Sequence, residues 1–331
     1  MMILSVDGGA TKTCAILYDD ERKRFVSSGI AGPSHFVSVS PNISEKNIRE
    51  AVNEALLEGD ENIDNVDSVI LGVAGAGDSI ETTVRGEKIV QRVLGRKKFV
   101  LNNDGYVAYR MSNLFQDGVM FAPGTGSVGF YQKSGELNRI AGWGWFAGDE
   151  GSASWIAKRA ITLAERQKDG LIPGDTFVRL IEEYFSDNFK EAIGHLEIVH
   201  DKRKVSLLAP RVSQLASSGD ELALSIIFEA GEYVGNAINA CLKNFDEYPE
   251  VSVVGGTVQA GEHFKKAIEK ASRCRPRFFA GYDVCVGGIM IVSNTLGNNI
   301  SVEERDKIVT ELEHDIMKKP KERLRDSLGV L

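Results

Sequence analysis

The feature that most constrains this fold is a strand–glycine turn–strand pattern that occurs twice, about one domain length apart. The two copies cover residues 3–18 and 119–132, and their turns read Asp7-Gly8-Gly9 and Pro123-Gly124-Thr125-Gly126. Two apolar runs joined by a glycine turn predict a β-hairpin. The repetition indicates an internal duplication, with one hairpin opening each of two similar domains.

Strands alternate with amphipathic helices after the first hairpin, which indicates an α/β layer with a mixed sheet. The elements expected there are a strand at 24–30, a helix opening at Ser44, a strand at 67–73, a helix at 80–94 and a strand at 98–102. The second half is richer in helix, with helices expected at 152–167, 175–185, 205–217 and 220–244 and strands at 251–254 and 277–280. A last helix should begin at the capping box of Ser301 and Glu304 and stop before Pro320.

A length of 331 residues suits two domains of ordinary size. We expect a first lobe at residues 1–115, a hinge near 113–118 and a second lobe at 116–300. The C-terminal helix, residues 301–319, is expected to return to the first lobe.

Composition excludes several partners. The net charge of −8, with acidic and basic residues interspersed, argues against binding to nucleic acid or to an anionic membrane surface. The sequence contains neither a signal-peptide pattern nor an apolar run near the roughly 18–20 residues of a membrane span, so we expect a cytoplasmic protein. The isolated cysteines fit reduced, buried thiols better than a metal site: Cys14, Cys241, Cys274 and Cys285.

The first glycine turn is a candidate phosphate loop. Glycines let consecutive backbone N–H groups face an anion, and hydroxyls and a positive charge follow at once. The candidate residues are Gly8, Gly9, Thr11, Lys12 and Thr13. Asp7, at the end of the strand, is placed to hold Mg²⁺ through water. The alternative is an ordinary hairpin turn without a ligand.

Two further glycine turns extend this interpretation. Gly124, Thr125 and Gly126 form a similar glycine turn in the second half, so two loops could bind the phosphates of one nucleotide. A third turn, Gly255-Gly256-Thr257, follows a strand and suits a close backbone approach to a nucleoside, although a strand-to-helix turn without a ligand explains it nearly as well.

Asp104 is the candidate base. It follows the strand at 98–102 within the sequence Asn102-Asn103-Asp104-Gly105. A kinase acting on an alcohol needs a group that accepts the hydroxyl proton while the oxygen attacks phosphorus. The alternative role is a cap for the helix that follows.

The segment 142–152 places tryptophans between glycines and next to carboxylates. Glycine weakens strands, so a core strand is a poor explanation. A tryptophan ring such as Trp143 can cover the apolar face of a sugar, while Asp149 accepts its hydroxyl groups. The alternative is an aromatic plug, with Asp149 and Glu150 complementing the next helix N-terminus.

These motifs together resemble the BadF/BadG/BcrA/BcrD ATPase family, and within it the N-acetylglucosamine kinases and related archaeal sugar kinases. The motifs are VDGGATKT, NNDGYVAY, APGTGS, GWGWFAGDEGSASWIA, LAPRVSQLASSGD and VVGGT, in that order. The resemblance implies an actin-like ATPase fold with two RNase H-like lobes, ATP and Mg²⁺ in the cleft between them, a small sugar as substrate and a homodimer.

The resemblance also implies roles for individual residues. Asp104 matches the catalytic base of the family. The first phosphate loop corresponds to Gly9, Thr11 and Lys12, the second to Thr125 and Gly126, the sugar site to Ser127, Gly142, Trp143, Gly144 and Asp149, and the adenine side to Ala209 and Gly256.

One departure concerns the sugar. Family N-acetylglucosamine kinases have asparagine in the loop where this chain has His35, after Gly32-Pro33-Ser34. We expect Ser34, His35 and Asn103 to contact substrate, and the substrate stays open between a hexose, an N-acetylhexosamine and 2-keto-3-deoxygluconate.

Two other classes stay open. Relatives of this family activate 2-hydroxyacyl-CoA dehydratases with an iron–sulfur cluster, which requires clustered thiolates that the isolated cysteines do not suggest. A chaperone-like or regulatory nucleotide-binding module would leave the tryptophan–glycine segment unexplained.

Overall fold

The computed structural model describes residues 1–199 and 201–319, which divide into two compact units. Of these residues, unit 1 comprises 1–117 and 279–319, and unit 2 comprises 118–199 and 201–278. We expected the second lobe to run to residue 300. Residues 279–300 instead belong to unit 1, because helix α12 (Val286–Thr295) packs on helix α3 (Asp104–Asn113) and strand β1 (Met2–Gly8).

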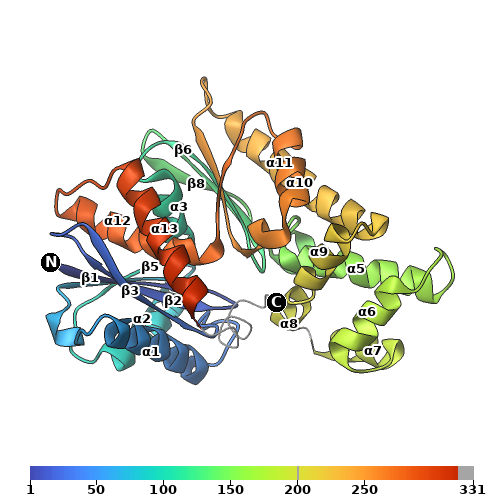
Figure 1. The fold of residues 1–331 in the computed structure, drawn as a ribbon, viewed down its shortest axis with the longest axis horizontal. Coiled ribbons are helices and arrows are strands. Elements are labelled where there is room, and N and C mark those ends of the chain that lie inside the picture. Colours follow the sequence, from blue (N-terminus) through green and yellow to red (C-terminus); the bar gives the residue numbers. More distant parts are fainter. Residues whose placement is uncertain (200, 320–331) are drawn as a thin grey trace. The chain divides into compact units, whose positions relative to one another are not determined.

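Unit 1 is built on a mixed five-stranded sheet of order β3-β2-β1-β4-β5. Its remaining strands are β2 (Thr13–Asp19), β3 (Arg24–Ala31), β4 (Ser68–Val73) and β5 (Val100–Asn102). Helices α1 (Pro41–Glu58) and α2 (Ile80–Leu94) cover one face, and α3, α12 and α13 (Val302–Lys318) cover the other (Figure 1). Cover on both faces explains why β1 and β2 are buried almost throughout.

Helix starts follow from capping residues. Ser79 and Ser301 form capping boxes at α2 and α13, as the sequence predicted for Ser301. The start expected at Ser44 is wrong, since Ser40 caps α1 and Pro41 follows as its first residue. Ser44 lies inside the helix, buried, and donates its hydroxyl to Ser34 O. Pro320, expected to end the last helix, lies outside the described residues.

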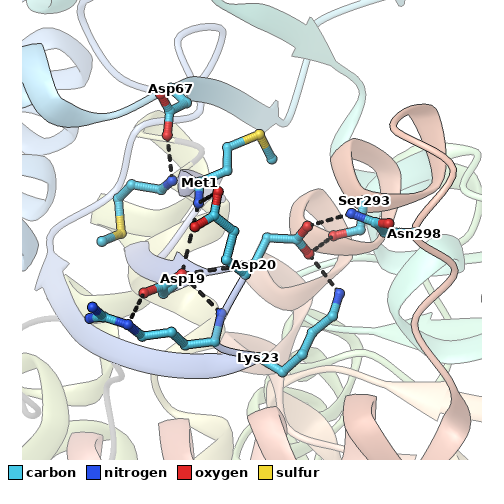
Figure 2. Close-up of polar contacts among 10 residues, drawn as sticks. Met1, Asp19, Asp20, Lys23, Asp67, Ser293 and Asn298 are labelled. Atoms are coloured by element: carbon cyan, nitrogen blue, oxygen red, sulfur yellow. Dashed lines mark hydrogen bonds and ion pairs between the residues drawn. The ribbon is translucent and has the colours of Figure 1, made fainter.

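A polar network ties the C-terminal part of unit 1 to its first sheet. Asp20, in the turn after β2, accepts hydrogen bonds from Ser293 Oγ at 2.8 Å, Asn298 Nδ2 at 2.8 Å and Lys23 Nζ at 3.0 Å (Figure 2). Burial alone raises the pKa of Asp20, but these three hydrogen bonds outweigh it and hold the pKa below its usual value. Residues about 270 positions apart in sequence are thereby fixed together.

Unit 2 repeats the sheet of unit 1. Its order is β10-β9-β6-β7-β8, formed by β6 (Gly118–Pro123), β7 (Ser127–Lys133), β8 (Glu136–Ala141), β9 (Glu250–Val254) and β10 (Arg277–Phe279). In both sheets an antiparallel three-strand meander is followed by a strand parallel to its first member. The two α/β units therefore confirm the expected two-lobed fold class.

Helices make up the rest of unit 2. They are α4 (Gly144–Ala147), α5 (Ala153–Lys168), α6 (Thr176–Phe185), α7 (Phe189–Ile198), α8 (Lys202–Ser206), α9 (Ala209–Ser217), α10 (Glu221–Leu242) and α11 (Glu262–Ala271). Of the short 3₁₀ turns, η2 (Gly256–Ala260) lies in unit 2, whereas η1 (Ile63–Asn65) and η3 (Gly281–Cys285) lie in unit 1. The helix expected at 205–217 is two helices, with Pro210 in the first turn of α9. Over the described part of the chain, no helix is long and apolar enough to cross a bilayer.

Candidate active site

The carboxyl edge of the unit 1 sheet gathers the acidic candidates. Strands β1, β4 and β5 run parallel, and their register places Asp7 beside Gly72 and Gly72 beside Asn102. Asp104 follows as the first residue of α3. Residues far apart in sequence therefore end at one edge, the usual position of a ligand in α/β folds.

Asp7 and Asp104 are buried carboxyl groups, and the charge of Asp104 acts on Asp7. Burial, and then the negative charge of Asp104, raise the pKa of Asp7 to about 8, although Lys12 opposes the rise. Burial raises the pKa of Asp104 to about 6 against a hydrogen bond from Gly105 N, and the charge of Asp78 adds to the rise. Two crowded carboxylates gain from a proton or a divalent cation, so the pair fits a magnesium ion that keeps most of its water.

The first glycine turn is held by backbone hydrogen bonds. Gly9 N donates to Lys12 O at 2.9 Å, and Gly9 O accepts from Ser34 N at 3.0 Å and from His35 N at 3.1 Å. A side chain at Gly8 would collide with Ser34, because a Cβ there would lie 2.4 Å from Ser34 Oγ. The structure thus brings the predicted loop into contact with Ser34 and His35.

The side chains of this loop face different surroundings. Thr13 Oγ1 lies 2.8 Å from Ser34 Oγ, whereas Thr11 is half-buried. Lys12 is buried, with Nζ 4.6 Å from the centre of the Tyr282 ring. Burial lowers the pKa of Lys12, while nearby groups, among them Asp7, raise it. The effect of burial is the larger, so the pKa of Lys12 lies below its usual value, and its amino group is desolvated next to Asp7.

Asn103 performs the capping role that was considered for Asp104. Its Oδ1 accepts from Gly105 N at 2.9 Å, and its Nδ2 donates to Ala76 O at 2.9 Å and to Asp78 Oδ1 at 3.3 Å. Asn103 therefore caps α3, and its hydrogen bonds hold the loop after β4 next to Asp104. Asp78, which sequence reasoning missed, carried no signal beyond being one acid in a glycine-rich loop.

His35 lies against the same loop. A Cβ on Gly75 would lie 3.4 Å from the His35 ring, and His35 Nδ1 lies 3.0 Å from Ser38 Oγ. Its ring is therefore oriented by Ser38 and by the glycine beneath it.

The second glycine turn is fixed within unit 2. Gly124 N donates to Gly126 O at 2.7 Å, and Gly124 O accepts from Ala153 N at 2.9 Å and from Thr257 Oγ1 at 3.2 Å. Ser154 N donates to Thr125 O at 3.3 Å. Hydrogen bonds from the start of α5 and from the third glycine turn thus fix the conformation of this loop.

The third turn packs directly on the second. Gly255 has φ +153°, and a Cβ there would lie 2.4 Å from Pro123 O, so only glycine fits. Gly256 begins η2, which packs against α9, whose first residue is the buried Ala209. The residues expected on the adenine side therefore belong to adjoining elements.

Asp149 lies next to the second loop as half of an ion pair. Its Oδ1 accepts from Ser127 N at 3.1 Å and its Oδ2 accepts from Lys202 Nζ at 2.6 Å. Asp149 is only 4% exposed and has φ +62°. Sequence reasoning missed Lys202, because a charged run at 201–204 resembles ordinary solvated surface.

The tryptophan–glycine segment carries two exposed aromatic side chains, although its last part, with Asp149, Gly151 and Ser152, is buried. Gly142 and Gly144 have φ values of +73° and +83°. Trp143 is 81% exposed and Phe146 is 96% exposed, whereas Trp145 packs against the unit 2 core. The aromatic plug therefore does not describe Trp143, whose ring is available to a ligand.

Comparison with known proteins identifies the family. The family model for the BadF/BadG/BcrA/BcrD ATPases matches residues 4–291. An N-acetyl-D-glucosamine kinase of Dictyostelium discoideum is 24% identical over 280 residues, covering 78% of this chain and 86% of the relative. A glucosamine kinase of Vibrio cholerae is 22% identical over 224 residues, covering 68% of this chain and 74% of the relative.

A solved structure supports the fold. A Chromobacterium violaceum protein, whose assignment as an N-acetylglucosamine kinase is itself provisional, matches with a TM-score of 0.72 at 22% identity. The match covers 88% of this chain and 98% of that one. With nearly the whole sequence matched by the family model, the chain belongs to the BadF/BadG/BcrA/BcrD ATPase family.

Proposed function

We propose that this protein is an ATP-dependent sugar kinase in which Asp104 is the general base. The observation that carries the proposal is the carboxylate of Asp104, with a pKa raised to about 6, at the sheet edge that also holds the first glycine loop. Such a group is ionised at neutral pH yet more basic than an ordinary aspartate. The names of the two curated relatives support a sugar as the acceptor.

In the proposed reaction a sugar hydroxyl oxygen attacks the γ-phosphorus of ATP, and the bond from that phosphorus to the ADP oxygen breaks. Asp104 accepts the hydroxyl proton and later releases it to solvent. The two glycine loops bind phosphate oxygens through backbone N–H groups, with Lys12 adding positive charge. Magnesium, held through water by Asp7, would neutralise phosphate charge.

Ser34, His35, Ser127, Trp143 and Asp149 are the proposed sugar contacts. An N-acetylhexosamine or a related hexosamine is the first substrate to test, because both curated relatives are named for such sugars. A hexose and 2-keto-3-deoxygluconate are the next. A cytoplasmic location, expected from the sequence, and a homodimer, implied by the family resemblance, complete the proposal.

The rival function, an electron-transfer activator, would need thiolates arranged around iron. The thiols of Cys14 and Cys285 lie 3.3 Å apart in unit 1, both buried, while Cys241 lies in the core of unit 2. Iron analysis of the purified protein tests this function directly.

The test of the kinase is ADP release with glucose, mannose, glucosamine, N-acetylglucosamine, N-acetylmannosamine, 2-keto-3-deoxygluconate and glycerol, with the product identified by mass spectrometry. We expect at least one sugar to yield its phosphate ester in equal amount to ADP. ADP release that no sugar stimulates would refute the proposal.

A further inference from the structure

The ammonium group of Lys202 lies against the second glycine loop and also forms an ion pair with Asp149. A Cβ added to Gly126 would lie 2.7 Å from Lys202 Nζ and 3.0 Å from Asp149 Oδ1. The ammonium group therefore rests directly on the glycine of the loop. The Lys202 side chain is 33% exposed while that of Asp149 is 4% exposed, so solvent and ligands reach the pair from the lysine side.

The two members of this pair are held differently. Asp149 keeps a second hydrogen bond, from Ser127 N, and lies between the loop and the start of α5. Lys202 stands at the beginning of α8, a helix of five residues. Its flexible four-carbon side chain can reach another partner, whereas the Asp149 carboxylate stays in place.

A phosphate bound by this loop would compete with Asp149 for the same ammonium group. Lysine binds phosphate as a mobile point charge, and the absence of a Cβ at Gly126 lets the ammonium group lie against the loop. Once Lys202 turned to the phosphate, Asp149 Oδ2 would lose its partner and could accept a hydroxyl group.

We propose that Lys202 is a phosphate-contacting residue of the nucleotide site and that exchange of its ion pair with Asp149 couples nucleotide binding to sugar binding. The coupling half rests on the proposed function, since it takes Asp149 as a sugar contact. Without nucleotide, Lys202 competes with the sugar for Asp149. With nucleotide, the carboxylate is released, so each ligand strengthens the binding of the other, reciprocally.

The first experiment needs no sugar. Binding of ADP and of adenosine, with magnesium, is measured by calorimetry on wild type, Lys202→Met and Lys202→Arg. Lys204→Met is the matched control, because Lys204 lies on the same helix but its Nζ is 5.2 Å from the Phe185 ring. We expect Lys202→Met to weaken ADP about 10-fold or more, as for a lost charged hydrogen bond, and adenosine less than about 2-fold.

Lys202→Arg should keep most of the ADP affinity, and Lys204→Met all of it. ADP affinity in Lys202→Met equal to that of the control would overturn the phosphate role. A parallel loss of ADP and adenosine would also overturn it, because it would report distortion of the whole loop.

The second experiment measures N-acetylglucosamine and glucosamine affinity with and without ADP. Wild type should bind the sugar about 5-fold or more tightly with ADP present. Lys202→Met should bind it equally well in both conditions, and without ADP at least as tightly as wild type does. Weaker sugar binding by Lys202→Met without ADP would show that Lys202 merely positions Asp149. If wild type binds neither these sugars nor any other in the panel, the proposed function fails, while the ADP comparison still decides the phosphate role.

Discussion

Replacing Asp104 with asparagine should make the protein inactive and more stable at once. The asparagine keeps the shape and an acceptor for Gly105 N, which donates to the carboxylate at 2.9 Å. It removes the proton acceptor, and loss of a general base lowers kcat by about 10² to 10⁴. It also removes a charge that burial disfavours.

The size of the stabilisation follows from the pKa of Asp104, which is raised from 3.8 to about 6. Each unit of pKa difference between folded and unfolded states corresponds to about 1.4 kcal/mol, so the full shift is worth about 3 kcal/mol. Because the side chain is only partly buried, we expect about 1–3 kcal/mol. The folded state binds this proton more tightly, so wild type loses stability as pH rises from about 4 to about 6.

The assay is urea unfolding of both proteins from pH 4 to pH 8 with a chelator, together with kcat at saturating substrates. The stability difference should be near zero at pH 4 and complete above pH 6, and wild-type kcat should fall as pH drops below about 6. Glu87→Gln, at an exposed position on α2, is the control for charge removal. A destabilised Asp104→Asn, or a difference independent of pH, would refute the reasoning, and turnover within a few-fold of wild type would remove Asp104 from the mechanism.

Three further substitutions test other parts of the molecule. Trp143→Ala should raise the sugar KM by a factor equivalent to about 1–3 kcal/mol while changing the ATP KM and the stability little, because the ring is 81% exposed; equal changes in both KM values would contradict a sugar contact. Asp20→Asn should destabilise unit 1 by about 1–3 kcal/mol at pH 7 in urea unfolding. That cost should disappear as pH falls through the lowered pKa of Asp20, since only the carboxylate contributes the stability, and a cost retained in acid would assign it to packing. Gly287→Ala should lower the melting temperature, with a cost of about 1–3 kcal/mol, because its Cβ would lie 2.0 Å from Val107 O; an unchanged melting temperature would show that α12 can move away.

Local signals predicted the elements well and their connections poorly. Helix α2 begins and ends where its periodicity predicted, because Ser79 caps it and Gly95 follows it. The two hairpins were recognisable from their glycine turns. Residues 279–300 return to unit 1 because α12 packs on α3. Neither segment contains a local sequence pattern that predicts this contact.

In the candidate site too, residues at strand ends were predictable from the sequence, whereas contacts between distant segments were not. Asp7, Asp104 and the glycine loops stand at strand ends, where position in sequence indicates position in the fold. The pair of Lys202 and Asp149 joins residues 53 positions apart, and nothing in the run at 201–204 marks one lysine among its neighbours. Trp143 is likewise exposed between two glycines with positive φ. The sequence shows that these glycines can adopt many backbone conformations, but not which conformation they take.

The interrupted course of unit 1 has a consequence for its synthesis. The first sheet emerges from the ribosome early, yet α12, which contacts Ser5 and Ile70 through Gly288, follows only after the whole of unit 2. At about 5–20 residues per second, those roughly 160 intervening residues take on the order of 10–30 s to translate. During that interval α3 already packs on this sheet face, but the apolar surface that α12 and α13 later bury stays open, a natural target for a ribosome-associated chaperone. Nascent chains stalled before residue 279 should accordingly be cleaved by protease within unit 1, and protection should appear once residues 279–319 have emerged.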